Sequence, residues 1–241
     1  FPVLLDIDGE RAEASAQEIA LTFGVKTLGL YTDITQREAI EHALSRTLGT
    51  FGRVDILINN AANNPKVEGI CPSGNHWSRL ESFPLDLWQQ DLAVGLTGAF
   101  LCSQIIGSEM ALQGKGVILN IASDLSVIAP DHSISWQPGL PQKQQPVKPV
   151  SYSVVKAGLL GLTRYLATYW ADKGVRVNAI SPGGVYNGQD PDFVQRLTNL
   201  IPLGRMARPD EYKAAVIFLV SDASVYMTGA NLVIDGGRTC W

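Results

Sequence analysis

The chain has 241 residues, of which 46% are hydrophobic and 17% are charged, and its net charge at pH 7 is −4. These values are typical of a single compact soluble domain spanning residues 1–241. The mild acidity excludes the electrostatic footprint of a nucleic-acid or anionic-membrane partner, and the sequence contains neither an apolar run of ~18 residues nor a signal peptide.

Short apolar runs alternate with helical patterns along the chain. Strands are predicted at residues 3–5, 25–31, 54–58, 116–121, 175–180 and 232–234. Helices are predicted at residues 10–23, 35–48, 84–112, 150–171 and 209–221, with Thr35 and Glu38 as a capping box and Pro84 at N1. Because the strands are apolar on both faces, the sequence predicts an α/β fold with a doubly wound parallel sheet.

Polar or turn-forming residues follow five of these strands, at the edge where a doubly wound sheet binds ligands. An acidic side chain such as Asp6 can accept hydrogen bonds from the adenosine ribose hydroxyls and repel a 2′-phosphate, which favours NAD over NADP. Asp33 could bond an adenine amine, although a capping or turn role accounts for either aspartate as well. Ser123 could donate to a substrate oxygen, and backbone groups near Val185 could bond a carboxamide.

The segment 150–162 reads as the start of a buried helix with Tyr152 and Lys156 one turn apart on one face. An ammonium about 4 Å from the phenol, at an effective dielectric of ~20, contributes roughly 4 kcal/mol and lowers the phenol pKa by up to about three units. Tyr152 is therefore a candidate acid or base. The pair alone is a weak signal, because Tyr-x-x-x-Lys arises by chance in roughly a quarter of chains of this composition.

The sequence shows no metal-ligand spacing and no disulfide framework. The cysteines are odd in number and widely spaced, which fits reduced thiols in a cytoplasmic protein; they are Cys71, Cys102 and Cys240. The histidines are scattered, and we expect structural or surface roles for them; they are His42, His76 and His132.

Several short motifs point in one direction when they are taken together. They are Asn59-Asn60-Ala61-Ala62, Asn120-Ile121-Ala122-Ser123, Tyr152-x3-Lys156, residues 175–183, Pro202-Leu203-Gly204-Arg205-Met206 and Val233-Ile234-Asp235-Gly236-Gly237. Jointly they closely resemble the short-chain dehydrogenase/reductase family, and the resemblance covers nearly the whole chain.

This resemblance implies a Rossmann-type fold and an oxidoreductase that passes a hydride between nicotinamide and a carbon bearing an oxygen. It implies that Tyr152 donates or accepts the proton, that Lys156 lowers its pKa and holds the nicotinamide ribose, and that Ser123 orients the reacting oxygen. The expected cofactor is NAD rather than NADP, with no metal. The implied cofactor-binding residues are Asp6, Ile7, Asp33, Ile34, Asn60, Ala61, Ala62, Tyr152, Lys156, Pro182, Gly183, Val185 and Asn187.

The sequence departs from the family pattern before its first predicted strand. The family has a glycine-rich pyrophosphate turn after an earlier strand, and the sequence supplies neither. That strand is central in the order 3-2-1-4-5-6, so its loss would split the sheet and leave backbone hydrogen bonds unmade. We therefore expect roughly 30 further residues before Phe1, forming a βα unit.

Two further departures concern the reaction centre. Gly95 stands where the family usually has an Asn that supports a proton-relay water, and we expect room there for a water or another side chain. Ser123 and Tyr152 are 29 positions apart, more than in simpler members. The additional residues at 133–149 predict a substrate-covering loop, whose amides and lysines favour a hydrophilic or anionic partner; a solvated surface insertion is the alternative.

The first hypothesis is an NAD-dependent alcohol dehydrogenase or carbonyl reductase for a polar small molecule, such as a sugar or nucleotide-linked sugar. Its loop character looks like that of members in surface-glycan or flagellin-modification pathways. A non-catalytic nucleotide-binding scaffold is one alternative, and an epimerase or dehydratase that recycles its nicotinamide is another. Because family members pair the helices at 84–112 and 150–171 across subunits, we expect a homodimer or homotetramer.

Overall fold

A computed structural model describes residues 1–63 and 74–241, so Cys71 and part of the predicted loop at 63–82 lie outside the described residues. Within the described part, every strand overlaps its predicted segment and pairs in parallel with its neighbours. The α/β prediction is therefore confirmed. The strands are β1 Val3–Asp6, β2 Leu28–Tyr31, β3 Ile56–Asn59, β4 Gly116–Ile121, β5 Val175–Pro182 and β6 Asn231–Ile234.

The strands form two sheets rather than one. β1 pairs with β2, and the second sheet has the order β3-β4-β5-β6. In the described residues no strand bridges β1 and β3, so β3 keeps one open edge, and both Ile56 and Ile58 are 43% exposed. The expectation of a βα unit before Phe1 stays a prediction.

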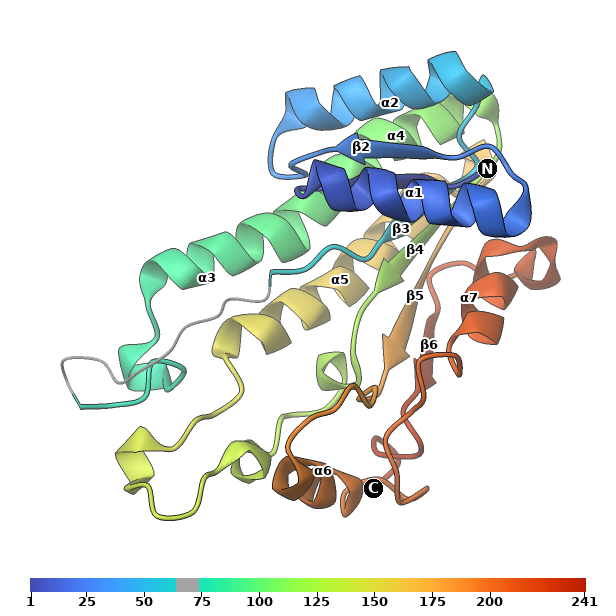
Figure 1. Ribbon diagram of the computed structural model, residues 1–241. Coiled ribbons are helices and arrows are strands. Elements are labelled where there is room, and N and C mark those ends of the chain that lie inside the picture. The colour runs from blue at the N-terminus through green and yellow to red at the C-terminus, as the bar shows by residue number, and fades with distance from the viewer. Residues whose placement is uncertain (64–73) are drawn as a thin grey trace.

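Helices cover both faces of the four-stranded sheet (Figure 1). On one face α4 and α5 pack over a core that includes Met110, Ile118 and Val177. On the other face α7 packs over Leu119 and Ile180. The helices are α1 Gly9–Phe23, α2 Arg37–Phe51, α3 Leu85–Leu92, α4 Ala99–Gln113, α5 Val150–Tyr169, α6 Pro191–Thr198 and α7 Lys213–Val220.

The predicted capping box of the second helix is wrong. The N–H and hydroxyl of Thr35 both donate to the Asp33 carboxylate, at 2.9 and 2.7 Å. Because Asp33 captures Thr35 in this turn, α2 begins later, with Gln36 as its N-cap. Pro84 is likewise the N-cap of α3 and not its first residue.

The helix α6 was not predicted, although its sequence carries a start signal. Asp190 is the N-cap, its carboxylate accepts a hydrogen bond from the Phe193 N–H at 3.0 Å, and Pro191 occupies the first turn. An acidic cap followed by proline is a common helix start. The segment before residue 209 is therefore ordered around this helix.

A π-helical segment, η2 Ala93–Gly98, joins α3 to α4 in one continuous helix. By length and composition alone, Leu85–Gln113 could cross a membrane. Its residues Cys102, Ile106 and Met110 are instead buried in the core beside the sheet. The fold thus accounts for the apolar character of the inner face of α4.

Candidate active site

Ser123 and Tyr152 meet at the carboxyl end of β4. Ser123 follows β4 after Ala122 and caps the short helix η3 Asp124–Ser126, while Tyr152 lies in the first turn of α5. The Ser123 hydroxyl lies close enough to the Tyr152 phenol to lower its pKa. Figure 1 shows the first turn of α5, the loop after β4, and α6 at the same end of the four-stranded sheet. The structure thus brings together two groups that the sequence separates by 29 positions.

Lys156 lies one turn further along α5 and faces inward. Its Nζ is 5.8 Å from the centroid of the Tyr152 ring and donates to the Ile121 carbonyl at 2.7 Å. The side chain is buried, with 8% of the residue exposed. Burial lowers the pKa of Lys156 to about 8, and repulsion from Lys148 contributes to the same shift.

The pKa of Tyr152 is raised, not lowered as the helical spacing predicted. Burial is the main cause, since it penalises the charged phenolate, and the Asp124 carboxylate adds repulsion. The nearby Ser123 hydroxyl acts in the opposite direction. The expectation of a depressed pKa is therefore wrong for this structure, because desolvation outweighs the attraction that the sequence argument considered alone.

A buried ion pair stands beside Ser123. Arg238 donates to Asp124 Oδ2 at 2.7 Å, and the two side chains are only 7% and 5% exposed. The other oxygen, Asp124 Oδ1, accepts hydrogen bonds from the Ser123 hydroxyl and from the Leu125 N–H, each at 2.8 Å. Asp124 therefore fixes the direction of the Ser123 hydroxyl, and Arg238 supplies its counter-charge.

The turn after β6 places Arg238. The Asp235 carboxylate accepts from the N–H groups of Gly237 and Thr239, at 2.9 and 2.7 Å. Gly236 and Gly237 have φ values of 69° and 92°, a region in which glycine is favoured. This turn folds the chain back so that Arg238 reaches the loop after β4.

Lys148 is one of the loop lysines for which the sequence predicted a hydrophilic or anionic partner, but its place beside Tyr152 was not predicted. It lies just before α5, and its Nζ is 3.6 Å from the centroid of the Tyr152 ring, in a cation–π contact. Asp124 could have been noticed because it adjoins Ser123. Arg238 could not, because it lies 114 positions beyond Asp124.

The space beside Gly95 holds another side chain, which is one of the two occupants expected there. A Cβ at this position would lie 2.5 Å from Val155 Cγ1. Because residue 95 is a glycine and not the family's usual asparagine, space is open beside it. The side chain of Val155, one residue before Lys156, fills that space. The family's amide at this position has no replacement from Val155, which is purely apolar.

The loop at 124–149 is anchored by polar contacts near its end, while its residues 136–143 are exposed. Gln145 is buried, and its amide bonds both backbone groups of Gln137 and the Leu140 carbonyl. The loop is also joined to the preceding segment, because the Val147 N–H donates to Ser78 at 3.0 Å. At least one of the loop amides that the sequence predicted to favour a hydrophilic partner, that of Gln145, therefore has a structural role.

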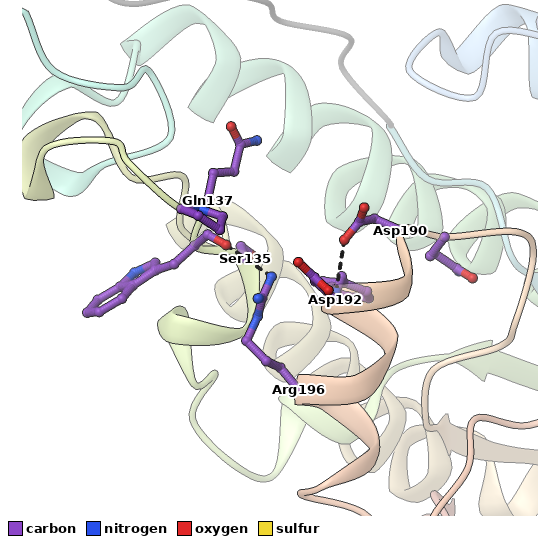
Figure 2. A pocket seen from close by; sticks show the side chains of 9 residues that line it. Ser135, Gln137, Asp190, Asp192 and Arg196 are labelled. Atoms are coloured by element: carbon purple, nitrogen blue, oxygen red, sulfur yellow. Dashed lines mark hydrogen bonds between the residues drawn. The ribbon is translucent and has the colours of Figure 1, made fainter.

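A cavity of about 520 Å³ lies between this loop and α6. Figure 2 shows Ser135 and Gln137 on the loop side, facing Asp190, Asp192 and Arg196. The Arg196 guanidinium donates to the carbonyls of Ile134 and Trp136, both at 3.0 Å. Arg196 therefore ties α6 to the loop.

The predicted adenosine-side residues stand at the ends of β1 and β2. Asp6 is exposed, and one of its oxygens accepts from the Asp8 N–H at 2.9 Å. Ile7 is 66% exposed. Asp33 holds Thr35 in its turn, while Ile34 packs against Gly98, where a Cβ would lie 2.6 Å from Ile34 Cδ1.

The residues predicted nearer the nicotinamide also follow strands. Asn60, Ala61 and Ala62 are exposed after β3, whereas the Asn59 amide donates to Asn120 and Ser103 and so has a structural role. Pro182 ends β5, and the Gly183 N–H donates to the Ile234 carbonyl at 2.8 Å. The Val185 carbonyl accepts from Gln189, and Asn187 is exposed.

Two observations fit a dinucleotide at this edge. The Thr32 hydroxyl, directly before Asp33, is buried without a hydrogen-bond partner among the described residues. The Val185 N–H likewise has no acceptor in the described part of the chain. By contrast, across residues 1–63 and 74–241 no group of His, Cys, Asp and Glu side chains is arranged to hold a metal ion.

Comparison with known proteins points to one family. Residues 2–136 match the family model described as short chain dehydrogenase, and residues 141–239 match that described as enoyl-(acyl carrier protein) reductase. The chain is 35% identical to the D-threitol dehydrogenase of Mycolicibacterium smegmatis, over 98% of this chain and 82% of the relative. It is also 35% identical to an NAD-dependent glycerol dehydrogenase of Listeria innocua, over 99% of this chain and 84% of the relative.

A solved structure shows the same architecture. The gluconate 5-dehydrogenase of Burkholderia cenocepacia, crystallised with NADP and tartrate, superposes with a TM-score of 0.82 at 26% identity. The match covers 99% of this chain and 85% of that protein. The likeness thus extends over the whole described fold.

Proposed function

The chain belongs to the short-chain dehydrogenase family of oxidoreductases that act on CH–OH groups, and on that premise we propose that it interconverts a secondary alcohol and a ketone of a polyhydroxylated substrate. The observation that carries this proposal is the meeting of Ser123, Tyr152 and Lys156 at one strand edge. No other cluster in the described residues combines a buried phenol with a hydroxyl partner and a buried amine.

In the proposed reaction the Tyr152 phenol gives its proton to the ketone oxygen, or takes the proton from the alcohol. The Ser123 hydroxyl turns its one proton from Asp124 Oδ1 to the same oxygen and holds it at the phenol. Lys156 supplies positive charge beside the phenolate and a donor for the cofactor ribose. The raised pKa of Tyr152 keeps the phenol protonated, which suits a proton donor in the reduction direction.

A nicotinamide cofactor, when bound, donates or accepts the hydride. We propose NAD rather than NADP, because the exposed Asp6 carboxylate would bond the ribose hydroxyls and repel a 2′-phosphate. Asp33, Ile7 and Ile34 would line the adenosine side. Asn60, Ala61, Ala62, Pro182, Gly183, Val185 and Asn187 would complete the site at the other strand ends.

The proposed substrate class rests on relatives and on the surroundings of the site. The relatives are named for threitol and glycerol, and the solved structure for gluconate. The loop at 124–149 supplies polar groups next to Tyr152, among them the Lys148 ammonium. A substrate that carries several hydroxyl groups matches this polar environment. A role in surface-glycan or flagellin modification has no support among these relatives.

The test is hydride transfer by the purified protein with a panel of four- to six-carbon polyols and NAD or NADP. Tyr152→Phe removes the proton-carrying group and is expected to lower kcat about 10²–10⁴-fold with little change in cofactor affinity. Tyr226→Phe is the matched control, because Tyr226 is fully exposed. Unchanged turnover in Tyr152→Phe would exclude the proposed chemistry.

The same panel separates two other hypotheses. A scaffold protein would bind the cofactor without any turnover. An epimerase or dehydratase would consume a sugar nucleotide with no net change in reduced nicotinamide. Preference for NADP over NAD would in turn contradict the role proposed for Asp6.

We also propose that the protein assembles as a homodimer or homotetramer through α4 and α5. Large apolar or aromatic side chains on these helices remain exposed, namely Phe100, Leu112, Tyr165 and Tyr169. Pairing two copies across these helices would cover them. Light scattering during gel filtration measures the assembly directly.

A further inference from the structure

Lys148 places a positive charge directly on the proposed acid–base group. It ends the loop before α5, and its Nζ lies 3.6 Å from the centre of the Tyr152 ring. Lys156 approaches the same ring from further away, at 5.8 Å. Tyr152 is thus flanked by two ammonium groups, of which Lys148 belongs to the loop and not to the α5 motif.

No carboxylate is available to neutralise Lys148. In the described part of the chain it forms neither an ion pair nor a hydrogen bond with a side chain. Asp124 is near enough to affect the pKa of Lys148, but it is already paired with Arg238 at 2.7 Å. Burial lowers the pKa of Lys148, so the charge is held at a cost in this environment.

Lys148 also lines a cavity of about 330 Å³ beside the first turn of α5. Ser153 lines the same cavity, and its hydroxyl is buried without a hydrogen-bond partner among the described residues. Pro149 and Val150 place the N-terminal end of α5 in the wall, where the helix dipole favours an anion. Three features of this cavity therefore favour negative charge, while the Glu81 carboxylate in the lining opposes it.

The other residues that line the cavity favour an anion with a single negative charge. Arg79 is the other strong cation of the lining, but it pairs with Glu81 at 3.5 Å and donates to the Gln142 carbonyl at 3.0 Å. Val147 and Val154 make other parts of the wall apolar. One unpaired ammonium and one unpaired hydroxyl match a carboxylate better than a doubly charged phosphate.

We propose that the substrate is a polyhydroxy carboxylate, whose carboxylate group binds Lys148 and Ser153 in this cavity while its reacting carbon extends past Lys148 to Tyr152, which lies against Lys148 but does not itself line the cavity. This inference rests on the proposed function, because it names the substrate class of the same site. Lys148 then acts in specificity: it distinguishes a sugar acid from the corresponding neutral polyol. It also explains why the loop carries a lysine against the phenol ring, where a neutral residue would pack at lower cost.

The experiment compares steady-state kinetics for four- to six-carbon aldonates, the matching alditols and the matching alditol phosphates. We expect the highest kcat/KM for an aldonate. Lys148→Gln is expected to raise KM for that aldonate about 10–100-fold, the effect of losing a charged hydrogen bond. Because Lys148 also lies against Tyr152, any change in kcat should be the same for aldonates and alditols, so the ratio of their kcat/KM values should fall about 10–100-fold. Lys148→Arg should recover most of this loss.

Lys143→Gln is the matched control, since it removes an exposed lysine from the same loop and should change neither constant. Ser153→Ala should raise the aldonate KM less than Lys148→Gln does. A preference for alditols or phosphates, or an equal loss for all substrates in Lys148→Gln, overturns the inference and leaves the proposed function standing. If no alcohol of any class is oxidised, the proposed function itself fails.

Discussion

At the scale of single residues, the site depends on how buried charges are compensated. Ser123 keeps its direction because Asp124 accepts its hydrogen bond, and Asp124 is tolerated in the interior because Arg238 pairs with it. Lys156 is buried with only a backbone carbonyl as acceptor. The paired charges of Asp124 and Arg238 and the unpaired charge of Lys156 should therefore affect the free energy of unfolding in different ways.

Asp124→Asn should destabilise the protein by about 3–5 kcal/mol, because it leaves the Arg238 guanidinium buried without a counter-charge. Chemical denaturation measures the loss. Adding Arg238→Met should recover part of it, since the pair is then removed as a whole. Lys115→Met is the control: Lys115 pairs with Asp222 at 3.7 Å with both side chains largely exposed, and the loss should stay below about 1 kcal/mol.

The stability of the protein should rise with pH because of Lys156. Its pKa is about 8 in the folded protein, against 10.5 as the ordinary value. Below pH 8 both folded and unfolded states hold the proton, and the cost of burying the charge is fully present. Between about pH 8 and 10.5 the unfolded state binds more protons, so this residue alone adds on the order of 3 kcal/mol to the free energy of unfolding.

The measurement is the free energy of unfolding from pH 7 to 10 for the wild type and Lys156→Met. As the pH rises, the free energy of unfolding of the wild type should increase relative to that of Lys156→Met, by the amount that the titration of Lys156 contributes. Parallel curves over this range would show that the lysine titrates normally in the folded protein.

Part of the candidate site follows from the sequence, for a physical reason. Tyr152 and Lys156 are four positions apart on one helix, so their shared face is a local property. Ser123 follows a buried strand at the edge where ligands bind. The pairing of Asp124 with Arg238, and the sign of the Tyr152 pKa shift, depend on contacts across the fold, and no local pattern contains them.

At the scale of elements, close packing between α5 and the π-helical segment η2 sets the position of Lys156. Gly95 in η2 lets Val155 approach, and Gly158 in α5 similarly meets Leu96, where a Cβ would lie 2.9 Å from Leu96 Cδ2. The two helices thus contact through small residues on both sides. The sequence located both helices, but it could not show that Val155 fills the space beside Gly95.

Gly95→Ala should destabilise the protein by about 1–3 kcal/mol, because the new methyl group would overlap Val155. Gly161→Ala is the matched control in α5: a Cβ there meets nothing within 4 Å, so the helix should gain up to about 1 kcal/mol. Thermal or chemical unfolding measures both. Val155→Ala should relieve much of the Gly95→Ala effect, and additivity of the two changes would contradict the proposed contact.

At the scale of the whole molecule, the described strands form two sheets of unequal size, one with two strands and one with four. β1 and β2 pair only with each other in the described residues, while β4 and β5 each have a partner on both sides. The smaller sheet is connected to the rest through packing of helix on helix, with Ile40 of α2 in the core beside α4. Among the described strands, no ladder of backbone hydrogen bonds joins the two sheets.

Native-state hydrogen exchange should show two levels of protection within the four-stranded sheet. Amides of β4 and β5 should exchange only through global unfolding, whereas those of β6, which pairs with β5 alone among the described strands, should exchange at lower free energy, through local opening. Equal protection of β4, β5 and β6 would mean that these strands open only together.

The late position of Arg238 also has a consequence for the protein as it is being synthesised. Asp124 leaves the ribosome 114 residues before its partner, which corresponds to roughly 6–23 seconds at ordinary translation speeds of ~5–20 residues per second. During that interval a nascent chain that collapses around β4 must bury a bare carboxylate or keep it in water. The reaction centre is therefore completed only once the turn after β6 has emerged, and a partly made chain holds a sheet without a working site.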